Sequence, residues 1–142
     1  MINAIIKGIG IELNAEFGDD YAIYAESVEQ GLEEPCFFIS CINPTSRVFL
    51  GNRYFKTNQM CIQYFPTGSG RKKAECNAVS ERLFNCLEYI SVSEDLVRGT
   101  KMTAETADGV LNFFVNYDLF VRKAADDEEA LEEISGTVKA KG

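Results

Sequence analysis

The chain has 142 residues, of which 46% are hydrophobic and 11% aromatic, so it is long enough to bury the core of one globular domain. Its formal net charge is -8, from 14 basic and 22 acidic residues, and this acidic balance argues against a protein that binds nucleic-acid phosphates. No apolar run approaches the ~20 residues of a membrane span, and the first residues show no signal-peptide pattern, so we expect a soluble cytoplasmic protein.

The N-terminal segment is predicted to form an amphipathic helix that Gly18 can end. Its apolar residues recur at three- and four-residue steps, on one stripe: Ile2, Ile5, Ile6, Ile9 and Leu13. Gly8 and Gly10 interrupt the helix, at about 1 kcal/mol each relative to alanine. They indicate a tolerated weakness or a close contact between helix and sheet. A phosphate-binding glycine loop is disfavoured, because no strand precedes the glycines.

Residues 21–26 alternate like a short strand, and a polar connection over residues 29–34 follows, which Pro35 ends. The nearly continuous apolar run of residues 36–42 suits a central strand covered on both faces. After it, we expect the following: a turn at residues 43–46, a strand at 47–50, a turn or bulge at Gly51-Asn52, and a long strand over 54–65. On that last strand Met60, Ile62 and Tyr64 share one face.

The C-terminal half is predicted to contain a second helix and a hairpin. The helix follows a loop over residues 66–73, and its apolar stripe consists of Cys76, Val79, Leu83, Cys86, Leu87 and Ile90. Strands over residues 97–106 and 110–121 flank Asp108-Gly109, the strongest hairpin signal in the chain. Alternation in the final strand predicts its inward face: Leu111, Phe113, Val115, Tyr117, Leu119 and Val121.

This order of elements predicts an α+β fold, with a mainly antiparallel sheet of four to five strands and two helices packed on one face. Residues 1–123 are expected to form this single domain. Residues 124–142 form an acidic tail with six acidic residues against two lysines. Such a segment is expected to be a short helix or disordered.

The sequence offers no catalytic pattern. It has no histidine, and adjacent carboxylates such as Glu33 and Glu34 point in different directions, so they indicate surface charge. The five cysteines are odd in number and lie in apolar segments without a Cys-x-x-Cys spacing, which favours free buried thiols, although a zinc site from distant segments remains conceivable. We therefore expect no catalytic, cofactor or metal site and no enzyme activity.

Four aromatic residues are candidates for a subunit interface. Phe114 and Phe120 lie on the otherwise polar face of the final strand. Phe55 and Phe65 likewise lie on the polar face of their own strand. Large aromatic side chains there need a cover. Either the tail or another strand packs over them, or they belong to an interface between subunits.

The loop over residues 67–73 is rich in glycine and ends in Arg71, Lys72 and Lys73. Its spacing does not match a P-loop. Three cations before a helix oppose the positive end of the helix dipole, so a compensating group is expected. The segment is either a solvated mobile loop or a docking loop for an acidic protein surface.

Several segments together resemble a known family. They are the opening helix, residues 28–32 leading to residues 35–39, the strand end at residues 63–66, and residues 108–113. In the order and the amino-acid sequence of these segments, the chain resembles the bacteriophage tail terminator family of long-tailed phages and prophages. The resemblance extends to about Val121 and leaves the acidic tail outside.

The resemblance implies a non-enzymatic subunit that forms a ring, typically a hexamer, on the last turn of the tail tube. The ring stops tube growth and prepares the tail for joining to the head. Its implied partners are other copies of itself, the tail tube protein and head-tail joining proteins, and DNA passes its lumen without specific binding. Assembly would occur in the bacterial host cytoplasm, and the protein would end in the virion tail.

Ring formation needs two different surfaces on each subunit. We expect the sheet face with Phe114 and Phe120 to supply one of them, and the loop over residues 67–73 to reach a neighbouring subunit or the tube. Two rival interpretations stay open: a head-tail connector or completion protein of the same particle, and an acidic binding or inhibitor module whose tail mimics DNA.

Overall fold

The computed structural model describes residues 1–25, 33–68, 70–123 and, as backbone, 132–134. The elements along the chain are α1 (Ile2–Phe17), β1 (Ala22–Tyr24), β2 (Cys36–Leu50), β3 (Arg53–Phe65), α2 (Lys72–Cys86), β4 (Tyr89–Val92), β5 (Asp95–Ala107), β6 (Val110–Tyr117), β7 (Leu119–Lys123) and β8 (Glu132–Ile134). Residues 28–32, part of the resemblance, and most of the acidic tail lie outside the described residues, so the expectation of helix or disorder in the tail stays a prediction.

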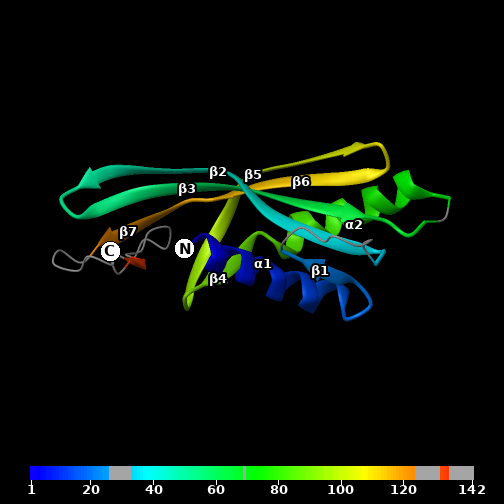
Figure 1. Ribbon diagram of the computed structural model, residues 1–142, viewed down its shortest axis with the longest axis horizontal. Helices are drawn as coiled ribbons and strands as arrows, with labels where there is room; N and C mark the ends of the chain where they lie inside the picture. The colour runs from blue at the N-terminus through cyan, green and yellow to red at the C-terminus, as the bar shows by residue number, and fades with distance from the viewer. Residues whose placement is uncertain (26–32, 69, 124–131, 135–142) are drawn as a thin grey trace.

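The strands form one sheet in the order β1-β2-β3-β6-β5-β4, with β7 paired to β3 and β8 to β7 (Figure 1). β1 runs parallel to β2, and every other pairing is antiparallel. Both helices pack on the same face of this sheet, within one hydrophobic cluster. The predicted α+β fold is confirmed, with more strands than the four or five expected.

The predicted stripe of α1 packs on the sheet, with Ile5, Ile9 and Leu13 fully buried. The helix ends at Gly18, which has a φ of 86° and donates its amide to the Asn14 carbonyl. A Cβ atom on Gly8 would lie only 2.5 Å from the Ser91 carbonyl oxygen, whereas one on Gly10 would meet no heavy atom within 4 Å. Gly8 therefore permits a close approach of helix and sheet, and Gly10 is the tolerated weakness.

The core lies between the helices and the inward face of the sheet. Cross-strand pairing places Ile39, Ile62 and Phe113 side by side on this face. The face that the sequence predicts for the final strand is confirmed, because Leu111, Phe113, Val115, Tyr117, Leu119 and Val121 are all buried. The strand itself is interrupted at Asp118. Even so, β6 and β7 keep one register along β3, since Asn116 faces Gln59 and Leu119 faces Lys56.

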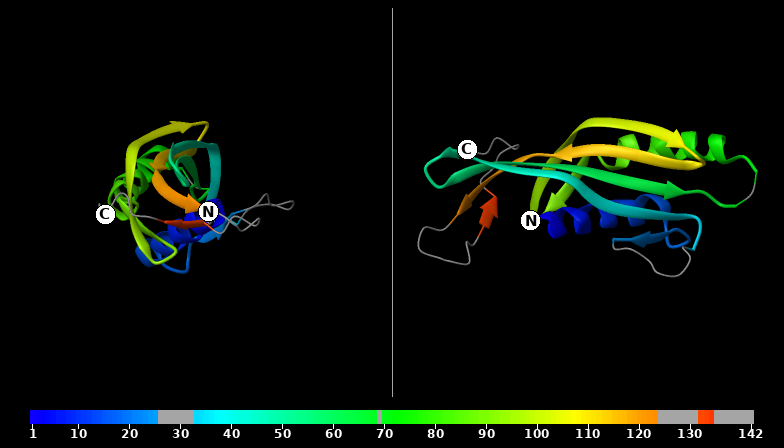
Figure 2. Two further views of the ribbon diagram at one scale, coloured as in Figure 1. Left: turned by 90° about the vertical axis from the view of Figure 1, so that its left-hand side faces the viewer. Right: turned by 45° about the horizontal axis from the view of Figure 1, so that its top comes forward.

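The sheet curls around α1, as the view along the molecule shows (Figure 2, left). The edge strand β4 reaches α1 from one side, and β1 and β2 reach it from the other. The curl brings Gly99 of β5 against the end of α2, where an added Cβ atom would lie 2.9 Å from the Leu87 carbonyl oxygen. Tyr117 donates its hydroxyl hydrogen to that same oxygen at 2.6 Å. This buried contact joins the sheet to the end of α2.

Two expectations for the second helix are wrong. Lys72 and Lys73 belong to the first turn of α2 and not to the preceding loop, and Ile90 lies in β4. Ile90 fits the helical spacing only by coincidence. In β4 it points inward together with Val92, whereas the residues beside them point outward. Four residues are too few for the two periods to be told apart.

Two expectations for the sheet are also wrong. Residues 43–46 are not a turn, because β2 continues to Leu50 with a register shift between Cys41 and Asn43. Pro44 is tolerated there because, among the residues that the structure describes, β1 pairs with only the first three residues of β2 and leaves the rest of that edge without a paired strand. The run of residues 36–42 is covered on both faces only at its start, where Cys36 and Phe37 are both buried, and Ile42 at its end is 48% exposed. The turn lies at Gly51-Asn52, between the paired residues Leu50 and Arg53.

Candidate assembly surfaces

One end of the molecule is an extended arm. We define the arm as residues 43–58 of the β2–β3 hairpin together with β7, which pairs with the outer half of β3. It projects beyond both helices at the left of Figure 1, with the Gly51-Asn52 turn at its tip. Residues 43–52 are all exposed. The arm therefore presents a large surface that the core of its own subunit does not cover.

The arm carries an aromatic cluster on the sheet face that points away from the helices. Phe55 and Phe120 are cross-strand partners whose ring centroids lie 4.9 Å apart, and the Phe49 ring lies 4.8 Å from that of Phe120. The guanidinium carbons of Arg47 and Arg53 lie 5.5 Å from the ring centroids of Phe55 and Phe120, respectively. Such cation–π contacts contribute about 0.5–1 kcal/mol each at exposed sites.

The structure brings together only two of the four aromatic residues predicted to form an interface. Phe65 pairs with Cys36 at the other end of β3, and Phe114 pairs with Cys61 near the middle of the sheet. All four side chains share one sheet face, and all four are partly buried. Phe120 is covered by Phe49 and Phe55 of its own subunit. That these four residues contribute to a subunit interface stays a prediction.

Sequence reasoning missed Phe49, Arg47 and Arg53. The sequence does contain a signal, because an arginine stands two residues before a phenylalanine on each side of the Gly51-Asn52 turn. Once the hairpin is recognised, this pattern places both arginines and both phenylalanines close together. The whole arm is also basic. It contains five basic residues and no acidic one: Arg47, Arg53, Lys56, Arg122 and Lys123. The register of β8 places Glu133 and Glu132 opposite the last two of these.

The loop before α2 is held by Glu75, in the first turn of that helix. Tyr64 donates its hydroxyl hydrogen to Glu75 Oε2 at 2.5 Å, and the backbone amide of Thr67 donates to the same oxygen at 3.1 Å. The Thr67 hydroxyl donates to Glu75 Oε1 at 3.0 Å. Burial raises the pKa of the Glu75 carboxyl, but these hydrogen bonds outweigh it and hold the pKa below its ordinary value. Glu75 also lies in the first turn of α2 close to the charge of Lys72, which fits the compensating group that the sequence leads one to expect.

Arg71, Lys72 and Lys73 lie exposed at the start of α2, at the end of the molecule opposite the arm (Figure 1). Lys72 extends along the β5–β6 turn, because a Cβ atom on Gly109 would lie 3.4 Å from its Cδ atom. The three cations are thus available to an acidic partner. Their role in docking stays a prediction.

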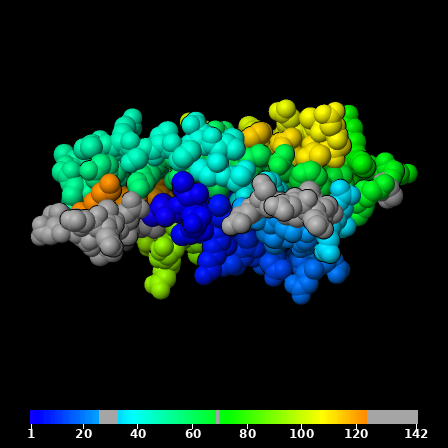
Figure 3. Space-filling model, viewed as in Figure 1, coloured from blue at the N-terminus to red at the C-terminus, as the bar shows by residue number. Residues whose placement is uncertain are grey.

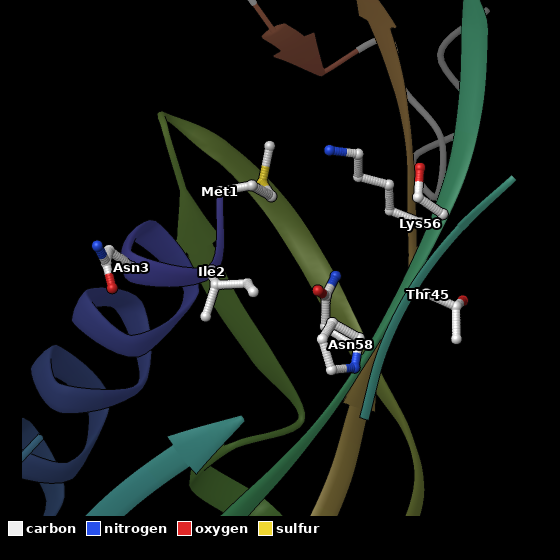
Figure 4. A pocket seen from close by; sticks show the side chains of 8 residues that line it. Met1, Ile2, Asn3, Thr45, Lys56 and Asn58 are labelled. Carbon is white, nitrogen blue, oxygen red and sulfur yellow. The ribbon is translucent and has the colours of Figure 1, made fainter. Parts of the chain in front are cut away.

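A pocket of about 420 Å³ separates the start of α1 from the base of the arm. Figure 4 shows Met1 and Ile2 on one side and Thr45, Lys56 and Asn58 on the other. Asn58 is buried and donates its side-chain amide to the Tyr117 carbonyl at 3.1 Å. The lining residues include no carboxylate and no thiol among those that the structure describes. The pocket therefore lacks a pair of groups for nucleophilic or acid-base chemistry.

The five cysteines are free thiols, as predicted. Burial raises the pKa of each thiol, and for Cys86 the pKa rises to about 12. Within the described ranges no group of three or more cysteine, aspartate or glutamate side chains is placed to hold a metal ion. The same part of the chain contains no helix long and apolar enough to span a membrane.

Comparisons with known proteins identify the family. One solved structure, of a protein designated only by a sequence identifier, matches with a TM-score of 0.42 at 14% sequence identity and covers 83% of this chain and 89% of that chain. A likeness of that degree carries no functional weight. No curated protein matches. A family model described as phage tail terminator protein matches residues 4–129. The chain therefore belongs to the phage tail terminator family, whose members are structural proteins of the phage tail and not enzymes.

Proposed function

We propose that this protein caps the tail tube of a long-tailed phage or prophage as a ring, stopping tube growth and preparing the tail for joining to the head. The observation that carries the proposal is the match of the tail terminator family over residues 4–129. The ring is a hexamer of this chain, bound to the tail tube protein on one side and to head-tail joining proteins on the other. It assembles in the host cytoplasm and becomes part of the virion tail.

Two features of the molecule support a ring. The arm and the cationic start of α2 lie at opposite ends of the subunit, so each copy offers two different surfaces. Contacts between unlike surfaces generate closed rings when the rotation between copies closes. The domain of residues 1–123 forms the wall of this ring. Its lumen is acidic or neutral, which lets DNA slide through without binding.

Negative-stain microscopy of the protein with its tail tubes tests the proposal directly. We expect rings of six copies at tube ends and tubes of uniform length when the protein is present during assembly. Tubes that keep growing in the presence of a folded protein would contradict the terminator role. Binding to head-tail joining proteins without binding to tubes would instead favour a connector.

A double variant tests the predicted aromatic interface. Phe114→Ala with Phe120→Ala removes two large side chains from the outward sheet face, and light scattering should show a loss of oligomers at concentrations where the wild type assembles. Phe84→Ala is the matched control, because Phe84 is exposed on α2 and packs edge-on against Phe113 on the other side of the sheet. An unchanged oligomer in the double variant would exclude these two residues from the interface.

A charge reversal tests the docking of the start of α2. The triple variant Arg71→Glu, Lys72→Glu, Lys73→Glu should weaken attachment to the tube, because the proposed partner surface is acidic. The measurement is tail assembly in a complementation assay. Glu81→Lys, a charge change on an exposed residue further along α2, is the control. Wild-type tail assembly by the triple variant would refute the role of these cations.

A further inference from the structure

The tip of the arm exposes three consecutive apolar side chains. Val48, Phe49 and Leu50 are 63%, 51% and 65% exposed and come directly before the turn. Isolated apolar residues are common on protein surfaces, but a contiguous group at the end of a projecting hairpin is typical of an interaction site. Two basic residues lie next to this apolar tip, because Arg53 pairs with Leu50 and the backbone amide of Lys123 donates to the Asn52 carbonyl.

A groove with complementary properties lies along α1 and β1. It has a volume of about 530 Å³ and a largely apolar lining that includes Ile6, Ile11, Ile23 and Ile39. Ile11 is 56% exposed, which is unusual for an isoleucine in the middle of a helix. Lys7 is the one basic side chain of the lining. The groove is thus a receptor for apolar side chains.

Acidic residues surround one end of this groove. Asp19 and Asp20 lie exposed after α1, and Glu33 and Glu34 lie exposed before β2. Two hydrogen bonds tie these segments to the groove. The side-chain amide of Asn14, a lining residue, donates to Asp19 Oδ1 at 3.1 Å, and the backbone amide of Glu33 donates to the Tyr24 hydroxyl at 3.2 Å. The charge of the groove end is therefore opposite to that of the arm.

The arm cannot reach the groove of its own subunit. The groove lining runs from Ile6 to Ala15 of α1, away from the start of the helix, whereas the arm projects beyond that start (Figure 1). Figure 3 shows the arm projecting at one end of the molecule, while α1 and β1 extend toward the other end. The two surfaces therefore meet only between different copies of the chain.

We propose that the arm tip of one copy binds the α1–β1 groove of the next copy. Val48 and Leu50 enter the apolar groove, with Phe49 held against Phe120 beside them, while the arginines of the arm face the acidic residues at the end of the groove. This contact joins unlike surfaces, as ring closure requires, and it rests on the ring of the proposed function. A protein partner fits better than DNA, because a DNA backbone offers no counterpart to the apolar tip.

Charge reversal tests this contact, scored as the fraction of tail tube ends capped by rings. In the arm variant Arg47→Glu with Arg122→Glu, and in the groove variant Asp20→Lys with Glu33→Lys, like charges face each other. We expect capped ends to fall about tenfold or more in each, since like charges across an interface cost several kcal/mol. The variant with all four changes restores opposite charges and should cap tubes nearly as well as the wild type.

Two controls keep the outcomes distinct. Arg98→Glu with Lys101→Glu changes the net charge as the arm variant does, on exposed residues outside the arm, and should cap tubes normally. Circular dichroism establishes that each variant is folded.

If the wild type caps tubes but the fourfold variant stays as defective as its parents, the contact is overturned and the ring stands. If the wild type forms no rings, the proposed function fails and the contact fails with it. Arm variants that cap normally but lose DNA from the particle would assign the arm to DNA and overturn the contact.

Discussion

Gly8 and Gly10 lie two residues apart in α1, and the same substitution at these positions should have opposite effects on stability. Alanine is favoured over glycine by about 1 kcal/mol in a helix interior, because it restricts the unfolded chain. A methyl group on Gly10 meets no atom within 4 Å, so Gly10→Ala should keep this gain. The free energy of unfolding should rise by about 1 kcal/mol.

A methyl group on Gly8 would lie 2.5 Å from the Ser91 carbonyl oxygen and 3.5 Å from Ile90 Cβ. The first distance is far below van der Waals contact, and the obstacle is backbone, so α1 or β4 must move. Overpacking of this kind costs about 1–3 kcal/mol. After the helix gain is subtracted, Gly8→Ala should lower the free energy of unfolding by about 0–2 kcal/mol. The two variants should therefore differ by about 1–3 kcal/mol.

Urea denaturation followed by circular dichroism measures this difference, provided that the m values of the variants agree. Thermal unfolding should show the same order, with about 3–5 °C for each kcal/mol in a chain of this length. Equal stabilisation of the protein by both substitutions would mean that α1 does not approach β4 this closely. Such a result would refute the packing of helix and sheet described above.

Three further outcomes are expected. Glu75→Gln should lower the free energy of unfolding by about 1–3 kcal/mol at pH 7, because it weakens hydrogen bonds to a charged group. Since the pKa of Glu75 is lowered in the folded state, the difference from the wild type should vanish as the pH falls through that pKa. A pH-independent difference in urea denaturation would contradict this. Tyr117→Phe should cost about 1–3 kcal/mol, since the buried Leu87 carbonyl loses its hydroxyl donor, and a neutral effect in the same assay would argue against that bond. Because burial raises the thiol pKa values, Ellman's reagent at pH 8 should react far more slowly with the native protein than with the urea-unfolded one, and five fast native thiols would refute the burial.

The sequence predicts well those elements whose periodicity is long. β6 gives several repeats of one pattern, and its buried face is correct residue by residue. In α1 the pattern is correct for Ile5, Ile9 and Leu13, whereas Ile2 and Ile6 are only half-buried. β4 is too short for this, because its inward residues also fit the end of a helix. The turn expected at residues 43–46 fails for another reason. Proline and asparagine signal a turn locally, but the described part of the chain places no strand against that edge of β2, so the strand can continue.

Surfaces are harder to predict than the core, because they depend on which strands become neighbours. Phe55 and Phe120 are 65 positions apart in the sequence, and only the pairing of β3 with β7 brings them together. A compensating group near the three cations could be expected from the helix dipole alone, and Glu75 fits it. Its partner Tyr64 could not be expected, since its side chain reaches Glu75 from a separate strand.

β3 runs without interruption from the tip of the arm into the middle of the core. Its partners β6 and β7 follow it in one register, so no flexible joint separates arm and body on this side of the sheet. The arm is thus a rigid extension of the sheet. Its direction is set by strand twist and by the register shift after Cys41 in β2. If the proposed ring is joined through this arm, the twist of the sheet sets the number of subunits, and a one-residue deletion at this register shift should change the angle at which successive copies meet.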